Sequence, residues 1–239
     1  MKVLAKTVST TNREERLIDY VVLTWNSEAT LYKALMSIIR YGKPRTIIVV
    51  DRFSVDKTLD IARSLGCRVV LLNKPLGFAR FVGAEEAGTH MIGYVDSDVE
   101  LTEEWILVLN ALGDPRFGDV GAFSAVYEGN RNLLERAKAH QYTRYGAFGC
   151  TIVKRRLVLE FQDIKKYSSG EDLAFSTFLN KKKLRWHVLP VEVKHHSKLT
   201  GIPTWLKYRW QGAGARVAGR HVFFVIGVFV LSLVGIKIS

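Results

Sequence analysis

The first hundred residues alternate between two patterns of apolar positions. Short apolar runs rich in β-branched residues predict buried strands, and the stretches between them repeat apolar side chains every three or four residues, as one face of a helix does. The predicted strands are residues 18–24, 46–50, 69–72 and 91–95. The predicted helices are residues 27–40, 55–65 and 77–87. This alternation predicts an α/β fold with a doubly wound, mostly parallel sheet sandwiched by helices.

The pattern becomes less regular after Leu101. Residues 102–109 predict a helix, and a charged helix over residues 132–142 is predicted between two strands, at 121–126 and 147–153. Pro, Gly and Ser do not gather into a linker. We therefore expect one compact domain over residues 1–200, followed by a separate segment over residues 201–239.

That C-terminal segment has the composition of a membrane-binding element. Residues 222–236 carry no charge, and as a helix they would span about 22 Å, which is short of a hydrocarbon core of ~30 Å. Residues 202–210 mix aromatics with cations, as do helices that lie among lipid headgroups. We expect an interfacial segment and a membrane anchor. The alternatives are a terminal element that packs on the domain and a contact between subunits.

The charge of the chain points to anionic partners. The 239 residues carry a formal net charge of +12 at pH 7, which favours nucleic acid, an anionic membrane or phosphorylated substrates. Because basic residues gather beside the apolar C-terminal segment, we expect a membrane lipid or lipid-linked partner and no nucleic acid. Arg216 and Arg220 favour a cytoplasmic flank for the apolar run. The expected location is thus the cytoplasmic face of a membrane. The oligomeric state stays open.

Two further features agree with a reducing compartment. Cys67 and Cys150 are too few for a disulfide framework, and their apolar surroundings predict buried free thiols. Residues 1–16 are polar and lack the apolar core of a signal peptide.

Polar residues follow each of the four predicted parallel strands. These residues are Asn26, Asp51, Asn73 and Asp96. Ligands of open α/β sheets bind beyond the carboxyl ends of the strands, so we expect a binding site at this edge.

Asp96-Ser97-Asp98 is the triplet at that edge with the clearest chemistry. Two carboxylates one residue apart suit Mg²⁺ or Mn²⁺, which takes a few hard oxygen ligands and completes its shell with water and substrate phosphate. A solvated turn is the alternative, because Asp-x-Asp is common in turns.

The order of motifs along residues 18–197 resembles that of family two glycosyltransferases of the GT-A fold. After the first strand comes Thr24-Trp25-Asn26-Ser27-Glu28, and after the second comes a stretch from Asp51 to Thr58 in which Arg52 and Phe53 replace the usual Asp-Gly. The stretch Asn73 to Arg80, the Asp96 to Asp98 triplet, Gly170-Glu171-Asp172-Leu173 and Val193-Lys194-His195-His196 follow in the family's order.

The resemblance implies a role for each matching residue. The nucleotide of the donor would be held by Thr24, Asn26, Glu28, Asp51, Arg80 and Asp96. The metal would be held by Asp98, Asp96 and His195, with His196 as the alternative to His195 because adjacent strand residues face opposite sides. Asp172 would be the general base, and Glu171 would position the acceptor.

Each of these residues also has a structural interpretation. Glu171 and Asp172 would then only place negative charge at a helix start, Arg80 would be a cation on a helix surface, and each histidine would be a surface or hydrogen-bonded residue.

The expected activity is therefore that of a metal-dependent inverting glycosyltransferase. It would use Mn²⁺ or Mg²⁺ and a UDP- or GDP-type nucleotide sugar, and it would glycosylate a hydroxyl or phosphate of a membrane-associated acceptor. A catalytically inactive, membrane-associated nucleotide-sugar-binding protein is one alternative. A nucleotidyltransferase is the other, although residues 24–28 lack the Gly-rich basic loop that would cradle a triphosphate.

Overall fold

The computed structural model describes residues 18–139 and 146–196. Its strands are β1 (Ile18–Thr24), β2 (Pro44–Asp51), β3 (Arg68–Leu71), β4 (Met91–Val95), β5 (Val99–Glu100), β6 (Val120–Tyr127), β7 (Cys150–Lys154) and β8 (Arg185–His195). Its α-helices are α2 (Glu28–Ser37), α3 (Thr58–Ser64), α4 (Leu76–Glu86), α5 (Trp105–Ala111), α6 (Arg131–Lys138), α7 (Arg155–Glu160) and α8 (Glu171–Lys181). The π-helix η1 (Ile38–Gly42) extends α2, and η2 (Pro115–Phe117) and η3 (Gln162–Lys166) are 3₁₀ turns.

The strands form one mixed sheet in the order β3-β2-β1-β4-β7-β6-β8-β5. Strands β1 to β4 are parallel to one another, and β6 is parallel to β8. Strand β7 pairs antiparallel with both β4 and β6, and β5 pairs antiparallel with β8. The prediction of a mostly parallel α/β sheet is confirmed, and β5 and β7 are its antiparallel strands.

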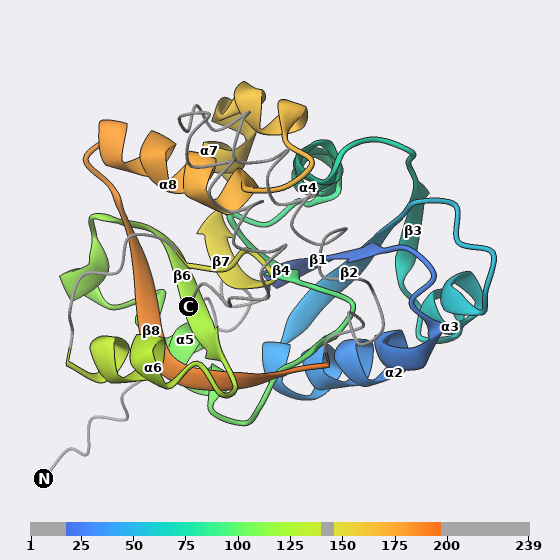
Figure 1. The fold of residues 1–239 in the computed structure, drawn as a ribbon, viewed down its shortest axis with the longest axis horizontal. Coiled ribbons are helices and arrows are strands. Elements are labelled where there is room, and N and C mark those ends of the chain that lie inside the picture. Colours follow the sequence, from blue (N-terminus) through green and yellow to red (C-terminus); the bar gives the residue numbers. More distant parts are fainter. Residues whose placement is uncertain (1–17, 140–145, 197–239) are drawn as a thin grey trace, which may run out of the picture.

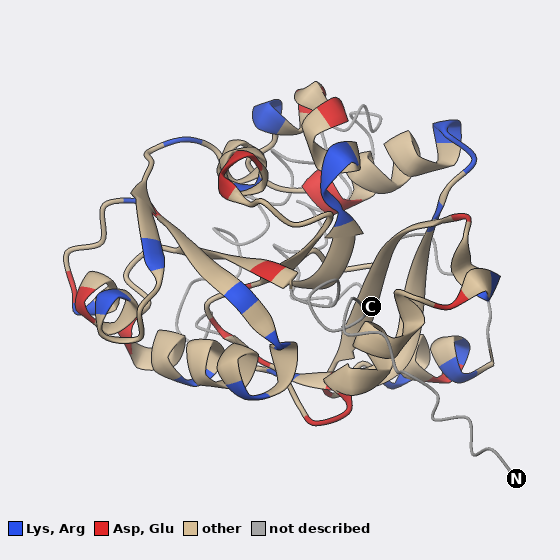
Figure 2. Ribbon diagram, turned by 180° about the vertical axis from the view of Figure 1, so that it is seen from behind, with Lys and Arg blue, Asp and Glu red and all other residues tan. Residues whose placement is uncertain are grey.

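Helices cover both faces of the sheet (Figure 1). On one face, Leu31 and Leu35 of α2 and Trp105 of α5 pack in a core with the side chains of β1 and β2. On the other face, α4, α7 and α8 supply residues such as Phe81 and Phe175 to a second core. The strands are largely uncharged, and most Lys, Arg, Asp and Glu lie on helices and loops (Figure 2). The sheet is therefore buried from both sides, as its near-continuous apolar strands require.

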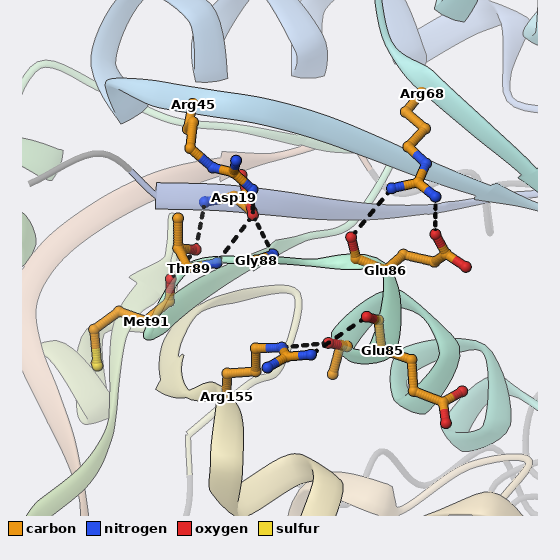
Figure 3. A network of polar contacts seen from close by, with 10 residues as sticks. Asp19, Arg45, Arg68, Glu85, Glu86, Gly88, Thr89, Met91 and Arg155 are labelled. Atoms are coloured by element: carbon orange, nitrogen blue, oxygen red, sulfur yellow. Dashed lines mark hydrogen bonds and ion pairs between the residues drawn. The ribbon is translucent and has the colours of Figure 1, made fainter. Parts of the chain in front are cut away.

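Asp19 is a charged residue inside β1, and it fixes the end of α4 against the sheet. The side chain is fully buried and accepts hydrogen bonds from Arg45 of β2, with Nε at 2.9 Å, and from the backbone N–H groups of Gly88 and Thr89. Figure 3 shows this network between β1, β2 and the turn that joins α4 to β4. A buried carboxylate needs such partners because its desolvation is costly.

Most predicted elements are confirmed within two or three residues, with a few exceptions. The helix predicted over 27–40 continues as a π-helix to Gly42, and the strand predicted over 147–153 begins only at Cys150. Strand β8 starts at Arg185, well before the Val193 where the sequence motif began. Its apolar alternation is interrupted at Pro190, and the register with β6 shifts between Ser124 and Val126, opposite this part of β8. Pro breaks a strand pattern because it cannot donate a ladder hydrogen bond.

No helix in residues 18–139 or 146–196 is long and apolar enough to cross a membrane. The predicted interfacial segment and anchor, residues 201–239, lie outside the described part of the chain. The charged helix predicted over 132–142 ends earlier than predicted: α6 stops at Lys138, and Ala139 is no longer helical.

Candidate active site

The site lies where the carboxyl ends of six strands meet. Strands β1 to β4, β6 and β8 run in the same direction, and the antiparallel β7 begins at this edge, where Cys150 pairs with Val95. The turn from β4 to β5 carries the Asp96 to Asp98 triplet. The backbone N–H of Asp96 donates to the carbonyl of Gly149 at 3.0 Å. A single edge thus gathers residues that are far apart in sequence, from Thr24 at the end of β1 to His195 at the end of β8, as expected for this class of sheet.

Asp98 faces His195, and the sheet pairing explains why. Val99 of β5 pairs with His195 of β8, which brings His195 Nε2 to 3.5 Å from Asp98 Oδ2. His196 instead places its Nε2 3.0 Å from Glu100 Oε2. The two histidines therefore have different partners, as the alternation of strand side chains predicts. Only His195 is close to the Asp98 carboxylate.

The Asp98–His195 pair fits a divalent cation with an incomplete protein shell. A carboxylate oxygen and an imidazole nitrogen suit Mn²⁺ or Mg²⁺ when phosphate oxygens and water supply the other ligands. Within the described residues, no cluster of three or more His, Cys, Asp and Glu side chains is arranged to hold a metal ion. A metal at this pair would thus depend on the substrate for part of its coordination.

Tyr127 supports the histidine. Its ring stacks on that of His195, with centroids 4.5 Å apart and planes 18° apart. Burial raises the pKa of Tyr127 well above its ordinary value, so it stays a neutral phenol at physiological pH. Sequence motifs gave no sign of this residue, because it comes from β6 and meets His195 only through sheet pairing.

Asp96 faces Arg80 of α4. Arg80 Nη2 lies 3.3 Å from Asp96 Oδ1. Desolvation raises the pKa of Asp96, Arg80 opposes that rise, and the charges of Asp98 and Glu171 add to it. Gly149 packs so closely that a Cβ there would lie 2.2 Å from Asp96 Oδ2. Asp96 is thus held by its neighbours, and its predicted contacts with metal and donor stay predictions.

Arg80 is a buried cation. Only 3 % of its surface is exposed, and its Nε donates to Glu171 Oε1 at 3.0 Å. Its guanidinium also lies over the rings of Tyr94 and Phe148, with Cζ 5.5 Å and 5.0 Å from the ring centroids. The interpretation of Arg80 as a cation on a helix surface is therefore wrong, because α4 turns this side chain toward the sheet.

Asp172 lies in the first turn of α8, which begins at Glu171 after Gly170, whose φ of 75° is left-handed. Burial, and then the charge of Glu171, raise the pKa of Asp172 to about 6. The carboxylate accepts a hydrogen bond from the backbone N–H of Leu173 at 2.8 Å, which opposes the rise. Such a carboxyl is mostly ionised at pH 7 and yet basic enough to take a proton, as a general base must be.

The residues predicted for the nucleotide join the loops that follow β1 and β2. Asp51 is fully buried, and its oxygens accept from Thr24 Oγ1 at 2.6 Å and from the backbone and side chain of Ser54. Asn26 Oδ1 accepts from the backbone of Val55, and Glu28 Oε2 from that of Lys57. The structure thus brings Thr24, Asn26, Glu28 and Asp51 together, with their hydrogen bonds directed into the loops. Their contact with a nucleotide stays a prediction.

Two more groups complete this edge. Ser27 Oγ lies 2.9 Å from Ser97 Oγ, which connects the loop after β1 to the Asp96 to Asp98 turn. Trp25 is 62 % exposed, and Arg52 places its Cζ 5.7 Å from the Trp25 ring centroid while its Nε donates to Asn73 at 3.0 Å. Arg52, which departs from the usual motif, thus belongs to an exposed aromatic and cationic surface beside the turn.

The sequence pattern of glycosyl transferase family 2 matches residues 19–188, which is most of the chain. The chain belongs to this family. No curated protein matches it significantly. This glycosyltransferase carries the family's order of motifs on the strand ends described above.

Solved structures show the same fold at low sequence identity. A mannosyltransferase from Pyrobaculum calidifontis in complex with GDP-Man and Mn²⁺ has a TM-score of 0.68 at 19 % identity, over 84 % of this chain and 62 % of its own length. Glucosyl-3-phosphoglycerate synthase from Mycobacterium tuberculosis in complex with phosphoglyceric acid has a TM-score of 0.63 at 16 % identity, over 88 % and 83 %. TarS from S. aureus in complex with UDP-GlcNAc has a TM-score of 0.58 at 20 % identity, over 91 % and 71 %. This glycosyltransferase thus spans less than two thirds of the mannosyltransferase.

Proposed function

We propose that this glycosyltransferase moves a sugar from a nucleoside diphosphate donor to a hydroxyl or phosphate of a membrane-associated acceptor, with inversion at the anomeric carbon. The observation that carries the proposal is Arg80, which contacts both Asp96 of the metal motif and Glu171, the neighbour of Asp172. One guanidinium therefore connects the proposed site of the donor diphosphate to the helix that carries the proposed base.

The proposed donor site consists of Asp98, His195 and the loop after β1. The pair Asp98–His195 would hold Mn²⁺ or Mg²⁺, which neutralises the charge that develops on the leaving diphosphate. Ser27 places the loop after β1 against this turn, so the nucleoside would lie beside Trp25 and Arg52. Among structural relatives, the mannosyltransferase was solved with GDP-Man and Mn²⁺, and the synthase with UDP-Glc and Mn²⁺. These complexes support a nucleotide-sugar donor and a divalent cation.

Asp172 is the proposed base. An acceptor hydroxyl attacks the anomeric carbon from the side opposite the diphosphate and gives its proton to the Asp172 carboxylate. The bond from the sugar to the diphosphate breaks in the same step, and the nucleoside diphosphate leaves with the electron pair. The pKa of about 6 keeps Asp172 ready for this task at neutral pH.

The membrane-associated acceptor is supported by composition. The apolar residues 222–236 and the cations before them favour a protein that works at a lipid surface, on the cytoplasmic side. A lipid-linked sugar or a polyprenyl phosphate is therefore the proposed acceptor class.

Calorimetric titration of the full chain with UDP and GDP, with and without Mn²⁺, tests the donor site. We expect micromolar binding of one nucleotide that depends on Mn²⁺ and is weakened at least tenfold in Asp98→Ala. The matched control is Asp163→Ala, which removes a carboxylate from an exposed ion pair with Lys166 and should bind as the wild type does. Tight binding that ignores Mn²⁺ would contradict the proposed metal site.

Transfer from the nucleotide sugar that binds tests the base and the acceptor. With an acceptor that reacts through a hydroxyl, Asp172→Asn should keep donor and Mn²⁺ binding while transfer falls by at least a hundredfold. Lipid phosphates and glycolipids in vesicles should accept the sugar better than soluble glycans. Near-normal transfer by Asp172→Asn would exclude Asp172 as the base. Equal transfer to soluble acceptors would contradict the proposed membrane-associated acceptor.

A further inference from the structure

Arg80 lies between two carboxylates that come from different motifs. Its Nε contacts Glu171 at the start of α8, and its Nη2 contacts Asp96 at the end of β4. The side chains of Arg80 and Glu171 are only 4 % and 6 % exposed, so water screens this ion pair little. Asp96 reaches further toward the surface, with 34 % of its side chain exposed.

The surroundings of Arg80 hold it in one orientation. The Tyr94 hydroxyl donates to the backbone carbonyl of Arg80 at 2.6 Å, and the rings of Tyr94 and Phe148 lie against the guanidinium. Nη1 is buried and has no hydrogen-bond partner in the part of the chain that the structure describes. A planar guanidinium with several fixed N–H donors can contact two carboxylates at once, whereas a lysine ammonium has no such fork.

A contact made only for stability would not need these partners. Buried ion pairs are often no more stabilising than apolar side chains of similar size, because desolvation offsets their attraction. Here the pair connects the turn that bears Asp98 to the helix that bears Asp172. Arg80 can therefore act on both elements, through its contacts with Asp96 and Glu171.

We propose that Arg80 is a positioning residue that couples the metal-binding turn to the helix carrying the base, holding Asp96 and Glu171 in fixed orientation on either side of its guanidinium. The proposal rests on the proposed function. Arg80 does not contact the reacting atoms in it. It acts through Asp96 on the donor side and through Glu171 on the side of Asp172.

The charges around Asp172 allow a test of the proposal, because different variants should shift the pKa of Asp172 in different directions. Glu171, on the same helix, raises the pKa of Asp172, and Arg80, on α4, lowers it. Asp96, on the β4–β5 turn, faces both Arg80 and Glu171, and Asp98 acts on Asp96 in turn. Removal of the Arg80 cation should therefore raise the pKa of Asp172, and removal of the Glu171 anion should lower it.

The first experiment is the pH dependence of kcat/KM for transfer in Arg80→Gln and Glu171→Gln. Arg80→Gln should move the acidic limb of the profile to higher pH, and Glu171→Gln should move it to lower pH. The matched control is Arg155→Gln, which removes a guanidinium that also holds α4, through the carbonyls of Ala84 and Glu85 and not through a carboxylate. It should leave the limb in place. Shifts of the same sign, or no shift in either variant, would overturn the proposal.

The second experiment does not depend on activity. Mn²⁺ affinity is measured by calorimetry in the presence of UDP or GDP. Loss of the guanidinium that orients Asp96 should weaken Mn²⁺ binding in Arg80→Gln by about threefold or more, although removal of a positive charge from beside the site would by itself tighten it. If the wild type does not bind Mn²⁺ at all, the proposed function fails. If the wild type binds Mn²⁺ and Arg80→Gln binds it equally or more tightly, only the role of Arg80 fails.

Arg80→Lys separates charge from geometry. It keeps the positive charge, so the pH limb should stay near its wild-type position, yet kcat should fall at least tenfold because one ammonium cannot hold both carboxylates. KM for the donor should change less than kcat. A wild-type kcat in Arg80→Lys would show that charge alone suffices and would overturn the positioning role. If Arg80→Gln alone does not fold, the double variant Arg80→Gln/Glu171→Gln replaces it, because it removes both members of the buried ion pair. We expect the double variant to fold and its kcat to stay low.

Discussion

At the scale of single residues, the environment of Asp172 determines the pH range in which the proposed reaction can run. Burial and Glu171 raise its pKa to about 6, and the base must be deprotonated to accept a proton. Below pH 6 the rate should therefore fall about tenfold per pH unit, and above it the rate should level off. The measurement is kcat/KM for transfer from pH 4.5 to 8. A rate that is flat from pH 5 to pH 8 would contradict the assignment.

Gly149 is the second residue whose role follows from geometry. A Cβ at this position would lie 2.2 Å from Asp96 Oδ2 and 2.5 Å from the Tyr127 hydroxyl, so Gly149→Ala must displace both groups or shift its own backbone. We expect transfer to fall about a hundredfold, because misplacement by an ångström at a reacting site has effects of that order.

The check on Gly149→Ala is a comparison of transfer rate with unfolding midpoint. Gly113→Ala is the matched control, since a Cβ at Gly113 meets no atom within 4 Å. An active Gly149→Ala protein would show that Asp96 can move without cost.

At the scale of elements, the contact between α4 and η3 sets where Arg80 lies. Gly77 donates its backbone N–H to the Tyr167 carbonyl at 2.9 Å, and a Cβ on Gly77 would lie 2.0 Å from the carbonyl oxygen of Ile164. Gly77→Ala must therefore push α4 away from η3. We expect a loss of about 1–3 kcal/mol of unfolding free energy, together with a lower kcat.

Urea unfolding and transfer assays on Gly77→Ala test this coupling. Gly113→Ala again is the control for a glycine-to-alanine substitution that creates no steric clash. A destabilised protein with full kcat would mean that the position of α4 does not matter to the reaction.

Elements differ in how far local sequence predicts them. Strands β1 and β4 are apolar along their length and begin and end where the pattern places them. Strand β8 contains Pro190, which interrupts its apolar alternation, and only its last residues were expected, from their resemblance to the family's motif. It exists because β6 pairs along it on one side and β5 on the other, and those contacts are not local.

At the scale of the whole molecule, Asp19 connects the sheet to the turn after α4. Burial alone would raise its pKa, but the hydrogen bonds from Arg45, Gly88 and Thr89 outweigh burial and lower it below 3.8. A lowered folded-state pKa gives stability that is present above the unfolded-state pKa and is lost as the pH falls through the folded value. Asp19 should thus stabilise the fold at neutral pH and lose its effect in acid.

Asp19→Asn tests this. We expect it to lower the free energy of unfolding by about 2 kcal/mol at pH 7, and the difference from the wild type should shrink below pH 3.8. Urea unfolding at pH 7 and pH 3 gives the comparison. Asp163→Asn, in an exposed ion pair, should have little effect at either pH. An equal loss from Asp19→Asn at both pH values would contradict the linkage.

The sequence alone determined the family, the strand and helix order, and the residues that gather at one edge of the sheet. The spacing of apolar residues predicts a helix or strand because each element must bury its apolar face, and that spacing can be read locally. Parallel strands bring their carboxyl ends to the same edge of the sheet. Asp96 and Asp98 could be named for that reason, whereas Asp172 and His195 could be named only from the resemblance of their motifs to the family.

The tertiary structure decided what each of those side chains faces. Pairing of β5 with β8 placed His195, and not His196, beside Asp98. The rotation of α4 buried Arg80 between Asp96 and Glu171, and β6 brought Tyr127 onto His195. These contacts join residues far apart in the chain, so they depend on how layers pack and no local pattern records them. The pKa of Asp172 follows from the same packing, because desolvation depends on all the neighbours of a group together.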